Sequence, residues 1–294
     1  MLLALSSKLL FGESIWLWMF VAAVAFTMLS LPDISPHWIL RLYQAHPLQP
    51  REAPQLTMII RELAQRAGLE NIPRPYWVPS RTTNAFAVGT RNDAAIAVTD
   101  GLLQLLSPRE LAGVLAHEIS HIANNDMRLM GMADLISRMT HLMSAIGILL
   151  LLLSLPLMLF GFSPFSIPGI LLLVTAPTLS AFLQLGLSRI REYDADLQAA
   201  DITGDPEGLA SALSRIEQRQ GYLWRRILFP GYRDPEPSLL RTHPDTADRI
   251  QRLLELSRKP AGPFTRIRTE PVRLPPGYRV IRHPRHRTIF RIWH

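Results

Sequence analysis

The stretch SPRELAGVLAHEISH, residues 107–121, decides the fold because it predicts one capped helix with a single apolar face. Ser107 is a typical N-cap, Pro108 suits the first helical position, and Glu110 completes a capping box. Apolar side chains then recur at helical spacing (Leu111, Leu115, Ile119 and Ile122). We therefore expect this helix to dock on a hydrophobic core.

Two histidines four residues apart, His117 and His121, share one side of this helix and can offer their imidazoles to a single ion. Glu118 lies between the histidines and the apolar face, close enough to hold a metal-bound water. Zinc suits such a site because it can leave a position open for water, lowering the pKa of that water to about 7. Glu118 can then take its proton. The alternative is a pair of surface histidines on a capped helix.

A catalytic zinc ion needs a third protein ligand, and two known arrangements do not fit this sequence. The extended metzincin pattern would place Gly and then His where this chain has Asn124 and Met127. Intramembrane zinc proteases bury the motif within a span and use an Asp of a later span, but residues 139–188 contain no acid. We therefore expect the third ligand beyond residue 188.

The segment REYDAD, residues 191–196, offers acidic candidates at helical spacing. Glu192 and Asp196 are four residues apart and share a helix face, whereas Asp194 points elsewhere. We expect Glu192 to be the third ligand and Asp196 to accept a hydrogen bond that fixes a histidine tautomer. The alternative is an acidic cluster that balances neighbouring arginines.

Fifty consecutive residues without Asp, Glu, Lys or Arg, 139–188, separate the two halves of this predicted site. Within this block, residues 142–162 and 165–187 are each long enough to cross about 30 Å of hydrocarbon as a helix. The helices of a soluble domain need a polar face toward water, which this block lacks. We therefore expect a transmembrane helical hairpin; a fully buried soluble hairpin is the alternative.

Residues 15–31 form another uncharged apolar run, which we interpret as an uncleaved N-terminal membrane anchor. The alternative is a secretory signal with Lys8 as its basic region, although apolar sequence continues beyond the small residues at 23–25. Cytoplasmic segments beside spans carry an excess of basic residues, so we expect the globular parts on the cytoplasmic side. The arginines that support this orientation are Arg41, Arg51, Arg128, Arg138, Arg189 and Arg191.

The composition between residues 32 and 138 is that of a soluble domain. Short apolar runs predict strands at residues 76–78, 85–88 and 95–98, and residues 55–67 have helical spacing. The chain of 294 residues has no cysteine, which excludes disulfides and thiolate ligands.

Much of the net charge of +7 lies in the tail from Arg258 onward, where no nucleic-acid-binding motif is found. We expect no nucleic acid as a partner. Attraction of this tail to anionic lipid headgroups is the functional interpretation, and a solvated basic tail is the alternative.

Four stretches together resemble the HtpX-like membrane zinc metallopeptidase family of the gluzincin clan, which is related to the CAAX prenyl endopeptidases. They span roughly residues 50–255, and their order is far more specific than the zinc motif alone. HtpX proteins usually begin with two transmembrane spans, whereas the N-terminal part of this sequence shows one convincing span. The stretches are Asn84-Ala85-Phe86-Ala87, His117-Glu118-Ile119-Ser120-His121, Glu192-Tyr193-Asp194-Ala195-Asp196, and His243-Pro244 with Arg249.

The resemblance implies an α+β, mostly α fold with a gluzincin-like metallopeptidase domain and a small β-sheet. Together with the apolar runs, it predicts that a transmembrane helical hairpin interrupts this domain and that a transmembrane helix precedes it. The expected parts are an N-terminal membrane anchor (1–31), the first part of the peptidase domain (32–138), the hairpin (139–188), the second part with the third zinc ligand (189–258), and a basic Pro/Arg-rich tail (259–294).

The resemblance also implies roles for individual residues. It supports Glu192 as a ligand and one Zn²⁺ per chain. It implies that an edge strand formed by Asn84, Ala85, Phe86 and Ala87 pairs with an extended substrate backbone, although this stretch alone would be interpreted as a core strand.

A further implied role concerns His243, which would stabilise the oxyanion of the tetrahedral intermediate. Arg249 would support it. Considered without the family, His243 would be interpreted as a capping histidine at the start of a helix.

The function implied is that of an integral-membrane zinc endopeptidase in stress response and quality control, which clears misfolded or damaged membrane proteins. Its partners would be unfolded or membrane-protein polypeptides and the lipid bilayer. The expected location is the bacterial cytoplasmic (inner) membrane, multi-pass, with the catalytic domain facing the cytoplasm. One alternative is a zinc transporter or sensor, which would need ionisable residues that residues 142–187 lack. The other is a catalytically silent membrane zinc-binding adaptor.

Overall fold

The computed structural model describes residues 36–160, 167–227 and 246–258, and in the tail Phe264, Ile267, residues 269–275 and Tyr278. The predicted anchor at residues 1–31 and the predicted oxyanion residue His243 lie outside this part of the chain. The described residues form two compact units. The helical unit contains Asp126–Arg191, and the sheet unit contains residues from Ile34–Asn125 and Glu192–His294.

A four-stranded sheet lies at the centre of the sheet unit, with the strand order β1-β2-β4-β3. The strands are β1 (His46–Pro47), β2 (Arg74–Val78), β3 (Ala85–Gly89) and β4 (Ala94–Thr99). β2 and β4 run parallel, whereas β1 with β2 and β3 with β4 are antiparallel. The three predicted strands are confirmed, and β3 is an edge strand. β1 was not predicted because two residues are too few to show an alternating pattern.

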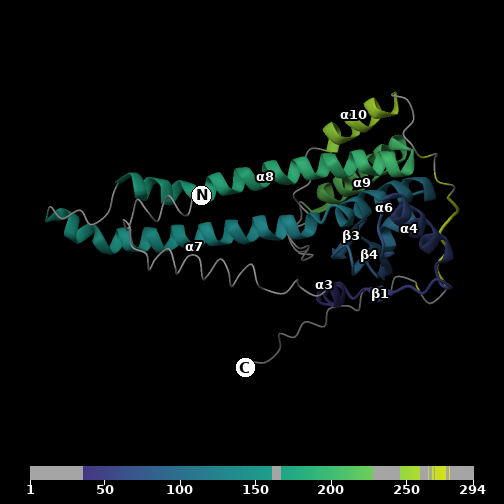
Figure 1. Ribbon diagram of the computed structural model, residues 1–294, viewed down its shortest axis with the longest axis horizontal. Helices are drawn as coiled ribbons and strands as arrows, with labels where there is room; N and C mark the ends of the chain where they lie inside the picture. Colours follow the sequence, from purple (N-terminus) through teal and green to yellow (C-terminus); the bar gives the residue numbers. More distant parts are fainter. Residues whose placement is uncertain are drawn as a thin grey trace. The chain divides into compact units, whose positions relative to one another are not determined.

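The two faces of the sheet are covered by different helices, because successive side chains of a strand point to opposite faces. On one face Ala97 of β4 and Phe86 of β3 share a core cluster with Leu40 of helix α3 (Pro36–Leu42). Ile96 and Val98 of β4 point to the other face and are fully buried. That face is covered by α4 (Pro54–Arg66) and α6 (Pro108–Ala123), as Figure 1 shows.

Helix α6 is the predicted capped helix, and its capping box is confirmed. The Ser107 side chain accepts the N–H of Glu110, and a Glu110 carboxylate oxygen accepts the N–H of Ser107 at 2.8 Å. The short helix α5 (Asp100–Leu105) connects β4 to this cap. The predicted apolar face of α6 is buried throughout (Leu111, Leu115, Ile119 and Ile122).

Helix α9 (Pro206–Ile227) packs closely on α6 at a glycine. A Cβ added to Gly113 would lie 2.9 Å from the backbone of Leu209, so only glycine permits this approach. Helix α10 (Thr246–Ser257) packs in turn on α9. These contacts fix α6 between the sheet and the C-terminal helices.

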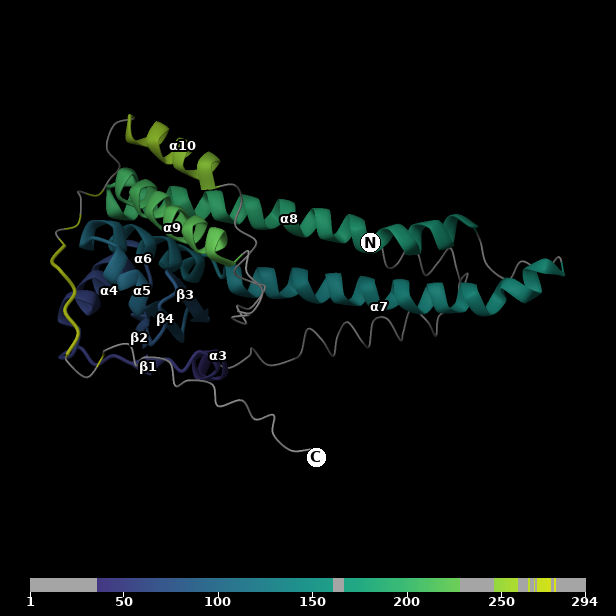
Figure 2. The ribbon, with the colours of Figure 1, turned by 180° about the vertical axis from the view of Figure 1, so that it is seen from behind.

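The helical unit consists of α7 (Asp126–Leu159) and the first part of α8 (Ile167–Thr203), which lie side by side in both views (Figure 2). Gly147 lies so close to Leu173 that a Cβ added at position 147 would overlap the leucine side chain. An ion pair of 2.6 Å between Arg191 and Asp126 joins the ends of the two helices.

The predicted hairpin segments are helical at residues 142–159 and 167–187, but the helices that contain them are longer than the predicted spans. Within the described residues, Leu171–Thr203 is the one helix whose length and apolar composition suffice to cross a membrane, and 28% of its apolar window is buried. The predicted span at residues 165–187 is therefore supported by length and composition. The spans at residues 15–31 and 142–162 stay predictions.

Candidate metal centre

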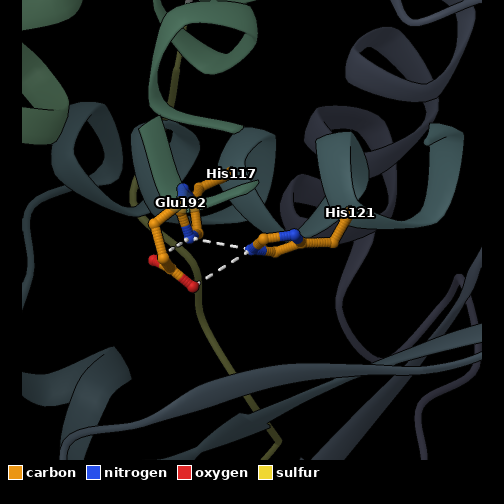
Figure 3. A group of neighbouring side chains, drawn as sticks. All are labelled: His117, His121 and Glu192. Carbon is orange, nitrogen blue, oxygen red and sulfur yellow. Dashed lines mark hydrogen bonds and ion pairs between the residues drawn. The ribbon is translucent and has the colours of Figure 1, made fainter. Parts of the chain in front are cut away.

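Helix α6 and the part of α8 that belongs to the sheet unit bring the three predicted ligands together (Figure 3). His117 and His121 extend from α6, and Glu192 extends from α8. The Nε2 atoms of the histidines are 3.2 Å apart. Oε2 of Glu192 lies 3.4 Å from Nε2 of His117, and Oε1 lies 3.7 Å from Nε2 of His121. One ion could therefore contact all three side chains.

These separations fit the edges of a zinc coordination tetrahedron. With metal–ligand bonds of about 2.0–2.1 Å, two tetrahedral ligands lie about 3.3–3.4 Å apart. The observed 3.2, 3.4 and 3.7 Å lie within a few tenths of an ångström of that range. Two imidazoles and one carboxylate are also the donor set of catalytic zinc sites, in which water takes the fourth position.

Asp196 lies behind the predicted ligand His117. Its Oδ1 atom is 3.0 Å from Nδ1 of His117, so Nε2 is the imidazole atom that faces the cluster. Asp196 is buried and lies one turn after Glu192 in α8. This is the geometry expected of a carboxylate that fixes the tautomer and the ring orientation of a metal-binding histidine.

Arg249 of α10 contacts both acidic residues of α8. Its guanidinium donates two hydrogen bonds of 2.7 Å to Asp196, and Nη1 lies 3.0 Å from Oε2 of Glu192. Arg249 is 3% exposed, and a buried guanidinium with two carboxylate partners is well compensated. We predicted that Arg249 supports His243; its described contacts are with the predicted ligand Glu192 and with Asp196.

The protonation of His117 follows from these neighbours. Burial by itself disfavours the charged imidazolium, but hydrogen bonds to Asp196 and Glu192 outweigh it and raise the pKa of His117 to about 10. A metal ion that binds Nε2 displaces this proton, because only the neutral nitrogen offers a lone pair.

The predicted catalytic base lies beside the edge strand. Oε2 of Glu118 accepts a hydrogen bond of 3.0 Å from the backbone N–H of Ala87 in β3. The N–H of Thr99 donates to the carbonyl of Asn84, so even-numbered residues of β3 bond to β4. The backbone groups of Ala85 and Ala87 consequently point to the free edge, on the side of Glu118.

The side chains of the predicted substrate-binding stretch have different surroundings. Phe86 is buried in the core on the α3 side of the sheet, where its ring lies 4.8 Å from that of Tyr43. Ala85 is buried, and Ala87 is partly exposed.

Two contacts that position the centre were not predicted from the sequence. The side-chain amides of Asn124 and Gln198 exchange hydrogen bonds of 3.0 and 3.1 Å and tie the end of α6 to α8. Tyr193 donates to Asp248 of α10 and carries the guanidinium of Arg252 over its ring. An amide or a tyrosine has no diagnostic spacing, so no local pattern could have identified either contact.

Known proteins resemble this chain over most of its length. The model of Peptidase family M48 matches residues 50–257. "Protease HtpX homolog" of Acaryochloris marina is 40% identical over 281 residues, which are 89% of this chain and 94% of the relative. A protein of the same name from Paraburkholderia phytofirmans is 37% identical over 243 residues, which are 76% of this chain and 81% of that relative.

Among solved structures, the crystal structure of S. mikatae Ste24p aligns with a TM-score of 0.47 at 22% identity. The alignment covers 86% of this chain and 61% of the Ste24p chain. The family match covers both helices that carry the His117, His121 and Glu192 cluster and most of the sheet unit. From its sequence and its site, the chain belongs to peptidase family M48.

Proposed function

We propose that this chain is an integral-membrane zinc endopeptidase, and the observation that carries the proposal is the cluster of His117, His121 and Glu192 beside Glu118. The two histidines and Glu192 would hold one zinc ion. Zinc would polarise the substrate carbonyl and make a bound water acidic enough to lose a proton near neutral pH. A peptidase of family M48 with this donor set fits hydrolysis better than zinc transport or storage.

Glu118 would act as the general base that takes the proton of the attacking water. Its carboxylate is half-buried and is held at the edge of β3 by the Ala87 N–H, one residue after the ligand His117. The same carboxyl group can pass the proton on to the leaving amine, as required for peptide hydrolysis. His243, by family resemblance, would donate to the oxyanion.

The substrate would bind as an added strand on the free edge of β3. The N–H of Ala87 already donates to Glu118, so an added strand would pair with the N–H of Ala85 and with the carbonyls of Ala85 and Ala87. A peptide paired there would pass beside Glu118. Only an extended segment can pair in this way, so unfolded polypeptides are the proposed substrate class. This preference supports a role in quality control of misfolded or damaged membrane proteins.

The membrane attachment is supported by the apolar surface of the helical unit. Large side chains of both helices are exposed there (Leu149, Leu152, Leu155, Leu171, Phe182 and Leu183). Apolar patches of this kind are unfavourable in water and suit a bilayer. With arginines at the base of the hairpin, we propose a multi-pass protein of the bacterial inner membrane whose sheet unit faces the cytoplasm.

The test is zinc analysis combined with casein cleavage in detergent, comparing the wild-type chain with Glu118→Gln. We expect one zinc per chain in both proteins and cleavage by the wild type alone, because the amide of the substituted side chain cannot accept the proton. Equal cleavage by Glu118→Gln would exclude this base. Binding of casein by the zinc-loaded wild type without fragments would instead identify a silent adaptor.

A further inference from the structure

Helix α3 (Pro36–Leu42) presents an apolar surface that no described residue covers. Trp38 is 74% exposed and Leu42 is 76% exposed, and their spacing of four residues places them on one side of the helix. Arg41 is exposed next to Leu42. We refer to Trp38, Arg41 and Leu42 as the α3 patch.

The opposite side of α3 fixes the orientation of this patch. Leu40 is 3% exposed and belongs to the core cluster on one face of the sheet. Just beyond the helix, the ring of Tyr43 packs on Phe86 of β3. Turning the α3 patch inward would expose Leu40, so the patch faces outward as part of the folded sheet unit.

The three residues of the α3 patch are of types that are common at membrane interfaces. Trp favours the headgroup level, where its ring is in apolar surroundings and its N–H can still find a polar partner. Leu favours the acyl chains below that level. An arginine can extend its aliphatic part along an apolar surface and place its charge among anionic headgroups.

If the proposed membrane attachment is correct, the chain connection itself places α3 near the bilayer. The apolar run at residues 15–31 ends five residues before Pro36. Five extended residues reach at most about 17–18 Å. If the run crosses the membrane, α3 must therefore begin within about that distance of the surface. A lipid surface is the apolar and charged partner that this connection brings within reach.

We propose that the α3 patch inserts into the headgroup region of the membrane that anchors the chain and holds the sheet unit against the bilayer. This proposal rests on the proposed membrane attachment and is independent of peptidase activity. Because Tyr43 joins α3 to Phe86 of the edge strand, insertion would keep β3 close to the lipid surface. The favoured substrates would then be polypeptide segments that leave the bilayer nearby.

The absence of cysteine permits a direct test in the full-length chain. In two variants, a single cysteine replaces Trp38 or Leu42 and carries a nitroxide spin label. Each labelled protein is reconstituted in vesicles of phosphatidylcholine and phosphatidylglycerol. Power saturation then compares the accessibility of each label to oxygen, which partitions into lipid, and to a water-soluble nickel complex. The matched control is Met58→Cys in α4, which is 57% exposed and lies on the helix layer of the other sheet face.

We expect oxygen to be the more accessible reagent at positions 38 and 42 and nickel to be the more accessible one at position 58. Labels at 38 and 42 that are as open to nickel as the label at 58 would overturn the proposal. Low accessibility to both reagents would overturn it as well, because a protein surface would then cover the patch. Either result can be obtained whether or not the chain cleaves casein.

A functional measurement uses the double variant Trp38→Asp and Leu42→Asp. These exposed side chains lie on α3, outside the two helices that carry the metal centre, so we expect casein cleavage in detergent to remain at the wild-type rate. Cleavage of an unfolded segment tethered to the same vesicles should decrease, because the sheet unit would be held less closely at the surface. An equal loss of cleavage for casein and for the tethered segment would contradict the proposed insertion. An unchanged rate for both substrates would contradict it as well.

Discussion

Arg249 of α10 and Asp196 of α8, 53 positions apart in the sequence, form a buried pair with two hydrogen bonds of 2.7 Å. The same guanidinium lies 3.0 Å from Glu192, while Asp196 also contacts His117. Arg249 therefore restrains one proposed zinc ligand directly and another through Asp196. We expect it to act as a positioning residue, and its contacts depend on the docking of α10 on the helix that carries Glu192.

Replacing Arg249 by methionine should destabilise the chain and weaken metal binding. Removing one partner of a buried ion pair leaves uncompensated carboxylates and costs about 3–5 kcal/mol. Loss of a group that orients metal ligands lowers affinity by about 10–100-fold. Thermal unfolding of the metal-free chain and zinc titration against a chelator would measure the two effects. Arg249→Lys should recover part of the stability but not the bidentate geometry.

The matched control is Arg252→Gln on the same helix. Arg252 is about half exposed and stacks on Tyr193. Its removal should cost about 1 kcal/mol or less and leave the zinc affinity unchanged. An Arg249→Met variant with the zinc affinity of this control would exclude Arg249 as a positioning residue.

Glu110 should make the attachment of α6 to α9 sensitive to acid. Its buried carboxylate accepts from Ser107 and Ser211 and pairs with Arg215 at 3.1 Å. Burial disfavours the charged carboxylate, but these hydrogen bonds and Arg215 outweigh it and lower the pKa of Glu110 below its ordinary 4.5. The folded chain thus binds this proton more weakly than the unfolded chain. The stabilisation is complete above pH 4.5 and is lost as the pH falls through the lower folded pKa.

Glu110→Gln should therefore lower the stability by about 1–3 kcal/mol near neutral pH, and the difference from the wild type should shrink in acid. Unfolding temperatures between neutral pH and about pH 3 would measure this trend. Glu62→Gln, which removes a more exposed carboxylate of α4, should change the stability by less than about 1 kcal/mol. A Glu110→Gln effect that is constant with pH would contradict the assigned role of its charge.

Gly113→Ala should destabilise the chain, although the same substitution usually stabilises a helix. Alanine normally favours a helix by about 1 kcal/mol over glycine. At position 113, however, the added Cβ would meet the backbone of Leu209, and overpacking of this kind costs about 1–3 kcal/mol. Gly131→Ala in α7 is the control, because nothing lies within 4 Å of its added Cβ. Equal unfolding temperatures for the two variants would contradict the close approach of α6 and α9.

Ala87→Pro should reduce proteolysis without removing the metal. Proline lacks the N–H that holds Glu118, but it is tolerated on an edge strand where that N–H points away from the sheet. A misplaced base can lower the rate by about 10²-fold. Casein cleavage and zinc content would be measured together, with Ala87→Gly as the control that retains the N–H. Wild-type cleavage by Ala87→Pro would show that this hydrogen bond does not position the base.

The helix α6 could be predicted because its determinants are local. A capping box and an apolar face repeat within one segment, and two histidines four residues apart must share a side. Glu192 was reached by a different route: the sequence offers few acids at helical spacing beyond residue 188, and the family resemblance favoured this one. The structure brings all three predicted ligands together.

The partners of Arg249 could not be predicted, because they depend on how α10 docks on α8 across 53 positions of sequence. The lengths of α7 and α8 were missed for another reason. Hydropathy marks where a helix is apolar, whereas the helix continues as long as no strong breaker interrupts it. α7 therefore begins at Asp126, well before the apolar run, and α8 continues to Thr203.

The contacts of Arg249 also determine the electrical balance of the centre. Glu118, Glu192 and Asp196 are three carboxylates around one guanidinium, and with neutral histidines they leave a formal charge of minus two. A divalent cation neutralises this charge, whereas a monovalent cation leaves one negative charge uncompensated in a largely buried site. We therefore expect the number of fixed charges, in addition to the shape of the site, to favour a divalent ion at this cluster. A substitution that removes any one of these four charges would unbalance the loaded centre by one unit.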